Sequence, residues 1–217
     1  MAGFRTISLA DQVFEKLEND IVTGVYPKGE ILTELKLVEQ LGVSRTPIRE
    51  ALRRLEQERL VQESGKGTVV LGITLEDLVD IMDIRQRSEG LAAFYAAKNL
   101  TPEGKEELAT ISELQDFYYS KHDIENLRKM DDRFHNTIYD LCGRTVVHDT
   151  LQPLHKKTQR YRKISIESID RQERSVREHK AIFEAICAGD AERAEALMHQ
   201  HIGNAKKSMI ERLHYYG

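Results

Sequence analysis

LGVSRTPIREALRRLEQERLV, residues 41–61, is the stretch that decides the fold of the first part of this chain. Residues four apart in a helical sequence share one face of the helix. Arg45, Arg49 and Arg53 therefore predict one polar stripe that faces solvent. A second, apolar stripe that packs into a core is expected from Ile48, Ala51, Leu52 and Leu55.

The residues before this helix predict two other helices and a tight turn. An amphipathic helix is expected over residues 9–22, and glycines and a proline then end it. A second helix is expected over residues 33–41, with Gly42 suited to the left-handed conformation that follows a helix. The third helix begins at Ser44 or Thr46, because either side chain can cap it.

After the third helix, RLVQESGKGTVV at residues 59–70 predicts two short strands around a turn at residues 64–67. Two helices joined by a tight turn and followed by such a hairpin describe a winged helix-turn-helix, whose second helix enters the major groove of DNA. Arginine suits that helix because its fork can bond O6 and N7 of guanine together. The candidate DNA-contacting residues are Ser44, Arg45, Thr46, Arg49, Arg53 and Lys66.

The charge of the chain does not by itself indicate nucleic acid. The 217 residues carry a net charge of −4. Lysines and arginines number 10 against 11 acids in residues 1–72, and 22 against 25 in residues 73–217. Only over residues 44–66 are they in excess, six against four. An ordinary solvated arginine face is therefore the alternative, and the order of the predicted elements favours DNA recognition over it.

Residues 31–70, ILTELKLVEQLGVSRTPIREALRRLEQERLVQESGKGTVV, resemble the winged helix-turn-helix of the GntR family of bacterial transcription regulators. The resemblance implies that Arg45 and Arg49 contact DNA and that Gly67 approaches the minor groove. Many members of that family have a further DNA-contacting arginine at the position of Leu35. The operator of a relative therefore cannot simply be transferred to this chain.

From residue 73 onward the apolar periodicity is helical throughout. We expect helices near residues 74–99, 101–121, 123–142, 145–166, 170–188 and 190–214. The predicted fold is thus mainly α, with a winged helix-turn-helix domain at 1–72 and an all-helical bundle of six or seven helices at 73–217. A bundle of this kind can enclose a small-molecule pocket.

The composition indicates an ordered cytoplasmic protein. No stretch approaches the roughly 18 apolar residues of a membrane span, and the first twenty residues carry acids where a secretion signal is apolar. Cys142 and Cys187 lie in apolar helical contexts without a CxxC spacing. We therefore expect buried, reduced thiols rather than a disulfide or a zinc ribbon.

Four residues of the bundle form a candidate metal site. Asp131 and His135 are four apart and share a helix face, and His179 and His201 come from the last two helices. Three imidazoles and a carboxylate suit zinc, nickel, iron or manganese, but spacing alone leaves ordinary core or surface histidines as the alternative. The segment from residue 75 onward, however, resembles the FadR-type C-terminal ligand domain (FCD), in the subset whose metal ligands match these four residues. Its motifs stand here as DDRFH, EHKAIFEAI and MHQHI.

Asp132 and His199 are second choices as ligands, because each lies near the proposed set in sequence. In the family that the bundle resembles, an arginine on the first helix of this domain meets the carboxylate of a small effector, and Arg85 holds that position. A helix-surface ion pair between Arg85 and Glu89 is the alternative. Zinc is our first choice of metal in a purified sample, with nickel, manganese and iron as alternatives.

Together these features predict a regulator rather than an enzyme. It binds double-stranded operator DNA, as the homodimer that the resemblance implies, and a divalent transition metal and a small carboxylate effector in the bundle modulate that binding. A metal-dependent enzyme is one alternative, but the sequence contains no helical HExxH, GxSxG or paired ExxH motif. A regulator with a purely structural metal is the other.

Overall fold

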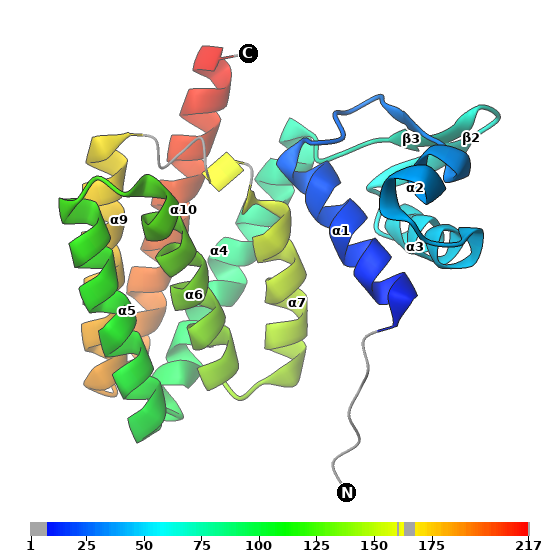
Figure 1. Ribbon diagram of the computed structural model, residues 1–217. Helices are drawn as coiled ribbons and strands as arrows, with labels where there is room; N and C mark the ends of the chain where they lie inside the picture. The colour runs from blue at the N-terminus through cyan, green and yellow to red at the C-terminus, as the bar shows by residue number, and fades with distance from the viewer. Residues whose placement is uncertain (1–7, 160, 163–167, 217) are drawn as a thin grey trace, which may run out of the picture. The chain divides into compact units, whose positions relative to one another are not determined.

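The computed structural model describes residues 8–159, 161–162 and 168–216. It contains two compact units, of which the first ends at Leu75 and the second begins at Glu76. Figure 1 shows a small sheet among the helices of the first unit, and a bundle of helices in the second. The predicted fold class, mainly α with a small β wing, is confirmed.

The first unit has a three-stranded sheet instead of the predicted hairpin alone. β3 is its central strand and runs antiparallel to both β1 and β2. The β2–β3 hairpin is the predicted wing, whereas β1 was not expected because two residues are too few to show an alternating pattern. The elements are α1 (Leu9–Thr23), β1 (Ile31–Leu32), α2 (Glu34–Leu41), α3 (Arg45–Gln57), β2 (Val61–Ser64) and β3 (Gly67–Val70).

The turn between α2 and α3 follows the capping chemistry only in part. The Thr33 hydroxyl accepts a hydrogen bond from the amide of Lys36 at 3.3 Å, which starts α2. Gly42 ends α2 in the left-handed conformation, with φ of 66°. Ser44 holds the N-cap position of α3, but its side chain makes no capping hydrogen bond. Ser44 is exposed, and its hydroxyl is not used to cap the helix.

The core of the first unit lies where α1, α2 and α3 meet the sheet. Side chains with no exposed surface come from every layer, namely Leu17, Leu32, Leu37, Ile48, Ala51, Leu55 and Leu60. Arg54 fastens α1 to α3, because its guanidinium lies 4.0 Å from the ring centroid of Phe14 and 2.7 Å from Oδ1 of Asp11. Of the arginines on α3, this one has a structural role.

The second unit is helical throughout its described residues. The helix predicted over residues 145–166 is interrupted, since α7 ends at Lys157 with Thr158 as its C-cap and residues 159, 161 and 162 are helical again. Residues 160 and 163–166 of that prediction lie outside the described residues. The helices are α4 (Leu75–Lys98), α5 (Pro102–Ser120), α6 (Ile124–Leu141), α7 (Thr145–Lys157), α9 (Ile169–Cys187) and α10 (Ala191–Tyr216).

In this unit α5 packs against α6 and α9, and α9 packs against α10. The interior contains fully buried apolar side chains from these helices, such as Leu108, Ile111, Phe134, Ile138, Ile182 and Met198. It also contains ionisable side chains that are at most 2% exposed, namely Arg85, Glu89, His135, His179 and His201. Charges taken out of water are costly unless they are paired, so these groups depend on one another or on a ligand.

The structure shows the surroundings of the two cysteines and the apolar character of the helices. Cys142 is buried, Cys187 is half-buried, and both are free thiols. No helix in the described part of the chain is long and apolar enough to cross a membrane.

Gly67→Ala should destabilise the first unit. Gly67 has φ of 132°, and a Cβ added there would lie 2.8 Å from the carbonyl oxygen of Leu32 in β1. We expect the free energy of unfolding to fall by about 1–3 kcal/mol, measured by urea unfolding followed by circular dichroism. Gly65→Ala is the matched control, because its Cβ would meet nothing within 4 Å. Equal stability of the two variants would contradict the close approach of β1.

Candidate functional site

α3 presents the predicted DNA-contacting side chains on one exposed surface. The exposed set at its start and along this face comprises Ser44, Arg45, Thr46, Arg49 and Arg53. The opposite face is buried in the core through Ile48, Ala51, Leu52 and Leu55. The two stripes expected from the four-residue spacing are therefore present. Lys66 is also exposed, in the turn between β2 and β3.

Arg49 is oriented by an acidic neighbour. Its Nε donates to Oε1 of Glu34 at 2.7 Å, and this hydrogen bond raises the pKa of Arg49. This hydrogen bond uses Nε. The two Nη groups at the end of the guanidinium can therefore contact a base or a phosphate. Arg49 and Arg53 line a groove with an open volume of about 830 Å³. Its other lining residues are Glu34, Leu52, Glu56, Glu63 and Thr68.

Gly67 has a structural role besides its expected approach to DNA, and Leu35 stands where an arginine is expected. The wing residue Gly67 is needed where β3 passes close to Leu32 of β1, so its lack of a side chain has a structural reason. Leu35 is 57% exposed at the start of α2, an apolar side chain at the position where the resemblance leads one to expect arginine.

Asp131, His135, His179 and His201 converge in the interior of the second unit, and we call these four residues the histidine–aspartate cluster. Asp131 and His135 lie on successive turns of α6, His179 on α9 and His201 on α10. One ligand atom from each lies within 4.8 Å of the others. Nε2 of His201 is 3.1 Å from Nε2 of His179 and 3.3 Å from Nε2 of His135. Nε2 of His179 is 3.6 Å from Oδ1 of Asp131.

These distances fit a shared metal ion. Ligand atoms about 2.1 Å from an ion lie about 3.0 Å apart at neighbouring corners of an octahedron and about 3.4 Å apart in a tetrahedron. A neutral imidazole has a single N–H, and a ring that donates from Nδ1 presents only a lone pair at Nε2. Three such lone pairs that face one another repel, and a cation between them turns that repulsion into binding.

Two carboxylates hold the Nδ1 side of two of these rings. Nδ1 of His135 lies 2.7 Å from Oε2 of Glu89, and Nδ1 of His201 lies 2.7 Å from Oε2 of Glu178. Ionised carboxylates only accept hydrogen bonds, so both rings carry their proton on Nδ1. This carboxylate–histidine arrangement fixes the ring and strengthens Nε2 as a metal ligand.

His179 is held by an amide and an aromatic ring. Its Nδ1 is 2.9 Å from Nε2 of Gln115, a side chain that is 1% exposed. In this orientation the amide N–H donates to Nδ1, whereas the amide turned by half a rotation presents its oxygen, accepts from Nδ1 and leaves Nε2 free to bind a metal. The ring of Phe134 stacks on His179 with a centroid distance of 4.3 Å. Each of the three histidines therefore has a fixed orientation toward the centre of the cluster.

Burial and charge favour the metal-binding protonation state of His179, His201 and Asp131. Burial lowers the pKa of His201 and lowers that of His179 well below its ordinary value. Burial alone would raise the pKa of Asp131, but the Arg162 guanidinium outweighs it and holds that pKa below its usual range. Burial is likewise outweighed at Glu178, where the hydrogen bond to His201 lowers the pKa to about 2. Neutral imidazoles and an ionised carboxylate are the forms that coordinate metal.

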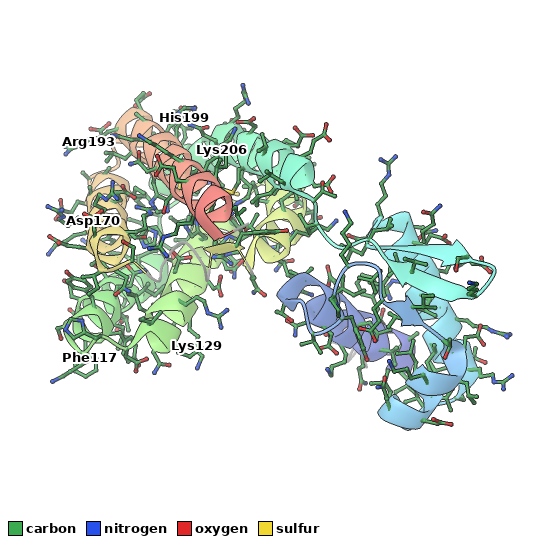
Figure 2. All side chains as sticks on the ribbon, turned by 90° about the horizontal axis from the view of Figure 1, so that it is seen from above. Phe117, Lys129, Asp170, Arg193, His199 and Lys206 are labelled. Atoms are coloured by element: carbon green, nitrogen blue, oxygen red, sulfur yellow. The ribbon has the colours of Figure 1, made fainter. Side chains whose placement is uncertain are left out.

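The two second-choice ligands lie outside the cluster. Oδ1 of Asp132 is 3.1 Å from Nε2 of His155, and Asp132 also pairs with Arg162. His199 is exposed, with its Nδ1 3.5 Å from Nε2 of Gln86. Figure 2 shows His199 on the outer side of the bundle.

Arg85 is buried, with 1% of its surface exposed. The pair with Glu89 is present, at 2.6 Å between Nε and Oε1, but in the interior and not at the helix surface. The Nη1 group donates to the hydroxyl of Thr158 at 2.7 Å, and Nη2 lies 3.0 Å from Nδ1 of His155. Glu89, His135 and His155 also lie close enough to hold a cation, but the guanidinium already supplies a positive charge beside them.

A pocket lies beside the cluster and is partly open to solvent. Three cluster residues, Asp131, His135 and His201, contribute to its wall. Four arginines line it as well, namely Arg85, Arg128, Arg162 and Arg171. Its remaining wall is made of Ser175, Ile202, Ala205 and Met209. The pocket therefore combines the cluster, positive charge and an apolar side.

Sequence reasoning missed most of the residues that support the cluster, namely Glu89, Gln115, His155, Arg162 and Glu178. Glu89 had a signal in its four-residue spacing from Arg85, and Glu178 in its place directly before His179. Arg162 belongs to the basic run 155–163, whose pattern indicates a mixed solvated and pocket-edge face. Its Nη1 donates to Oδ2 of Asp131 at 2.8 Å. Gln115 had no signal, because only the packing of α5 on α9 brings it to the site.

Comparison with protein families assigns both units. The FCD domain matches residues 80–204, which is more than half of the chain, and the gntR family of bacterial regulatory proteins matches residues 9–70. The chain belongs to the GntR family and carries an FCD domain.

Curated relatives of this GntR-family chain are regulators. The HTH-type transcriptional repressor RspR of Escherichia coli strain K12 is 27% identical over 199 residues, which span 91% of this chain and 87% of that protein. The gluconate operon transcriptional repressor of Bacillus licheniformis is 32% identical over 123 residues, which span 57% of this chain and 51% of that protein. The chain is accordingly a DNA-binding transcription regulator and not an enzyme.

Solved structures share the fold. Escherichia coli McbR/YncC has a TM-score of 0.79 at 24% sequence identity, covering 96% of this chain and 100% of that one. A putative GntR transcriptional regulator from Rhodococcus sp. RHA1 has a TM-score of 0.71 at 21% identity, covering 93% and 97%. At these identities the likeness concerns the fold alone.

Arg49→Ala should weaken sequence-specific operator binding by about 1–3 kcal/mol, because a bidentate arginine contact is lost. The stability of the first unit should hardly change, since Arg49 and its partner Glu34 are on the surface. Fluorescence anisotropy with a promoter fragment measures the first effect and thermal unfolding the second. Lys28→Ala, which removes an exposed charge from the same unit, is the control. Unchanged operator affinity of the Arg49 variant would contradict the assignment of the recognition face.

Glu178→Gln should lower the affinity for zinc by about 10- to 100-fold, because His201 loses the carboxylate that fixes its Nδ1 proton. The measurement is a competition titration against a chromophoric chelator. Glu184→Gln, an exposed acid on the same helix, is the matched control and should bind zinc like the wild type. If both variants bound zinc equally well, Glu178 would have no part in the site.

Proposed function

We propose that this GntR-family regulator senses a small carboxylate effector at a divalent transition metal held by the histidine–aspartate cluster. The observation that supports it is the convergence of three Nε2 atoms and one carboxylate beside a pocket lined by arginines. The mixed nitrogen and oxygen donors suit zinc first, and also nickel, manganese or iron. When bound, such a metal supplies a Lewis-acidic position for a carboxylate oxygen.

Arg85 is the proposed contact for the effector's carboxylate, because guanidinium groups and carboxylates form strong paired hydrogen bonds. Arg85 lines the pocket and is already bonded to Glu89, whose other oxygen holds His135. An effector carboxylate that binds Arg85 therefore weakens the ion pair between Arg85 and Glu89. Glu89 then becomes a stronger acceptor for the Nδ1 proton of His135, so effector and metal binding reinforce each other.

α4 is the proposed link to DNA binding. It carries both Arg85 and Glu89, and it begins at Leu75, where the first unit ends. In this proposal, a change in the position of α4 is transmitted to the first unit through the polypeptide backbone. We further propose that residues 1–72 bind the operator and that residues 73–217 bind the effector and form a homodimer. Two heads then meet two half-sites related by a twofold axis.

A purely structural metal is the second candidate role. The burial of the cluster, with each histidine at most 2% exposed, favours it to the same degree as the sensor. The two roles predict different consequences of metal loss. A structural ion stabilises the second unit without altering the response to a carboxylate, whereas a sensory ion is required for that response.

His179→Ala should remove most of the metal from a chain that otherwise holds about one ion, because an imidazole is lost from the cluster. Operator binding should persist, since the first unit has a core of its own. The response of operator binding to added carboxylates should disappear. Elemental analysis and operator titrations measure these effects, with His199→Ala, an exposed histidine on α10, as the control.

Full metal content in the His179 variant would overturn the cluster as the metal site. Loss of metal together with unfolding, with no carboxylate response in the wild type, would favour the structural role.

A further inference from the structure

Arg128 differs from the other arginines of the pocket. Arg85, Arg162 and Arg171 each bond an acid of the interior at 2.6–2.8 Å. Arg128 instead bonds Glu125, whose side chain is 58% exposed, so water screens that pair. Nε of Arg128, like Nε of Arg162, is buried and has no hydrogen-bond partner in the described part of the chain, but Arg162 is already paired with two acids of the interior. A buried N–H without an acceptor is unfavourable, which makes Arg128 a site for an anion.

With a divalent metal bound, the described charged groups around the pocket have a net charge of about +2, which a ligand with two negative charges would balance. Among the described residues, four arginines line the pocket. All of them except Arg128 contact acids of the interior, which are also four in number, namely Glu89, Asp131, Asp132 and Glu178. The two sets cancel. A divalent cation on the cluster then adds two positive charges, and Glu125 offsets little of this because it is exposed. A ligand with two negative charges balances a buried site in which unpaired charge is costly.

The backbones of Arg128 and Arg171 both lie on one side of the cluster along their helices. Arg128 precedes His135 by two turns on α6, and Arg171 precedes His179 by two turns on α9. At about 1.5 Å of rise per residue, each arginine backbone is about 10–12 Å along its helix from the histidine. Figure 1 shows that α6 and α9 begin, and α10 ends, at the same end of this unit. Arg128 therefore extends the site in this direction, whereas the guanidinium of Arg171 reaches Glu178, which also contacts His201.

An apolar stretch of α10 forms part of the pocket wall. Ile202, Ala205 and Met209 follow His201 on α10 at spacings that place them on one helix face, and all three line the pocket. Such a wall suits the methylene groups of a ligand and offers nothing to a chain of hydroxyl groups. The pocket is partly open to solvent, so a ligand can enter it from that side.

We infer that the pocket binds a short aliphatic dicarboxylate, with one carboxylate at the cluster and the other on Arg128. This inference rests on the effector site proposed above and names its ligand class. Arg128 is then the residue that distinguishes a dicarboxylate from a monocarboxylate. Arg171 also lines the pocket, but it is committed to Glu178 and through it to His201.

The test is a calorimetric titration of the zinc-loaded full chain with glutarate, succinate, butyrate and succinamate. Butyrate and succinamate keep one carboxylate and lack the second. The better of the two dicarboxylates should bind about 10- to 100-fold more tightly than either monoacid, the range expected for one charged hydrogen-bonded pair. Equal affinities for the diacids and the monoacids would overturn the inference.

Arg128→Gln should remove that preference. Its affinity for the dicarboxylate should fall about 10- to 100-fold, while its affinity for butyrate and its zinc content stay at the wild-type level. Arg133→Gln is the matched control, because Arg133 lies on the same helix and pairs with Glu107 at the surface. An unchanged preference in the Arg128 variant would overturn the role of this residue.

The two proposals fail in different ways. Butyrate binding as tight as glutarate binding, to protein that holds zinc, contradicts the dicarboxylate inference and leaves the carboxylate sensor intact. Zinc-loaded protein that binds none of the four acids contradicts both.

Discussion

Three buried imidazoles that face one another through Nε2, at 3.1 and 3.3 Å, impose the constraint on which the second unit depends. When each ring carries its proton on Nδ1, lone pairs meet lone pairs at Nε2, and protonated rings place cations against cations. A metal ion shared by the three Nε2 atoms relieves both conflicts. The helices do not relieve them. They preserve them, because Glu89, Gln115 and Glu178 hold the far side of each ring. A site that stays assembled against its own repulsion is preorganised for a cation.

The same carboxylates connect the cluster to the pocket. Glu89 is shared between His135 and Arg85, and Glu178 between His201 and Arg171, so each acid has a metal-site partner and a pocket partner. In the proposed sensor, an anion that binds the arginines therefore changes the affinity of the histidines for metal, and the reverse holds by linkage. One of these chains of contacts starts on α4, the helix that follows the first unit directly in the chain, and this continuity is the link that we propose between the pocket and DNA binding.

The sequence was informative where the determining contacts are local. The stripes of α3 follow from four-residue spacing, and the shared face of Asp131 and His135 follows from the same rule. That His179 and His201 complete the set came from a family resemblance, since no local rule brings three helices together. Gln115 could not be predicted, because its role exists only through the packing of α5 on α9. The strand β1 was not predicted for a different reason. A two-residue strand forms because it pairs with β3, and its own sequence pattern is too short to indicate a strand.

Anomalous diffraction at the zinc edge from crystals of the zinc-loaded chain tests the central claim most directly. The account predicts one strong peak per chain, about 2.1 Å from Nε2 of all three cluster histidines and from a carboxylate oxygen of Asp131. A peak between Glu89 and His155 instead, or no peak in this unit after zinc loading, would contradict it.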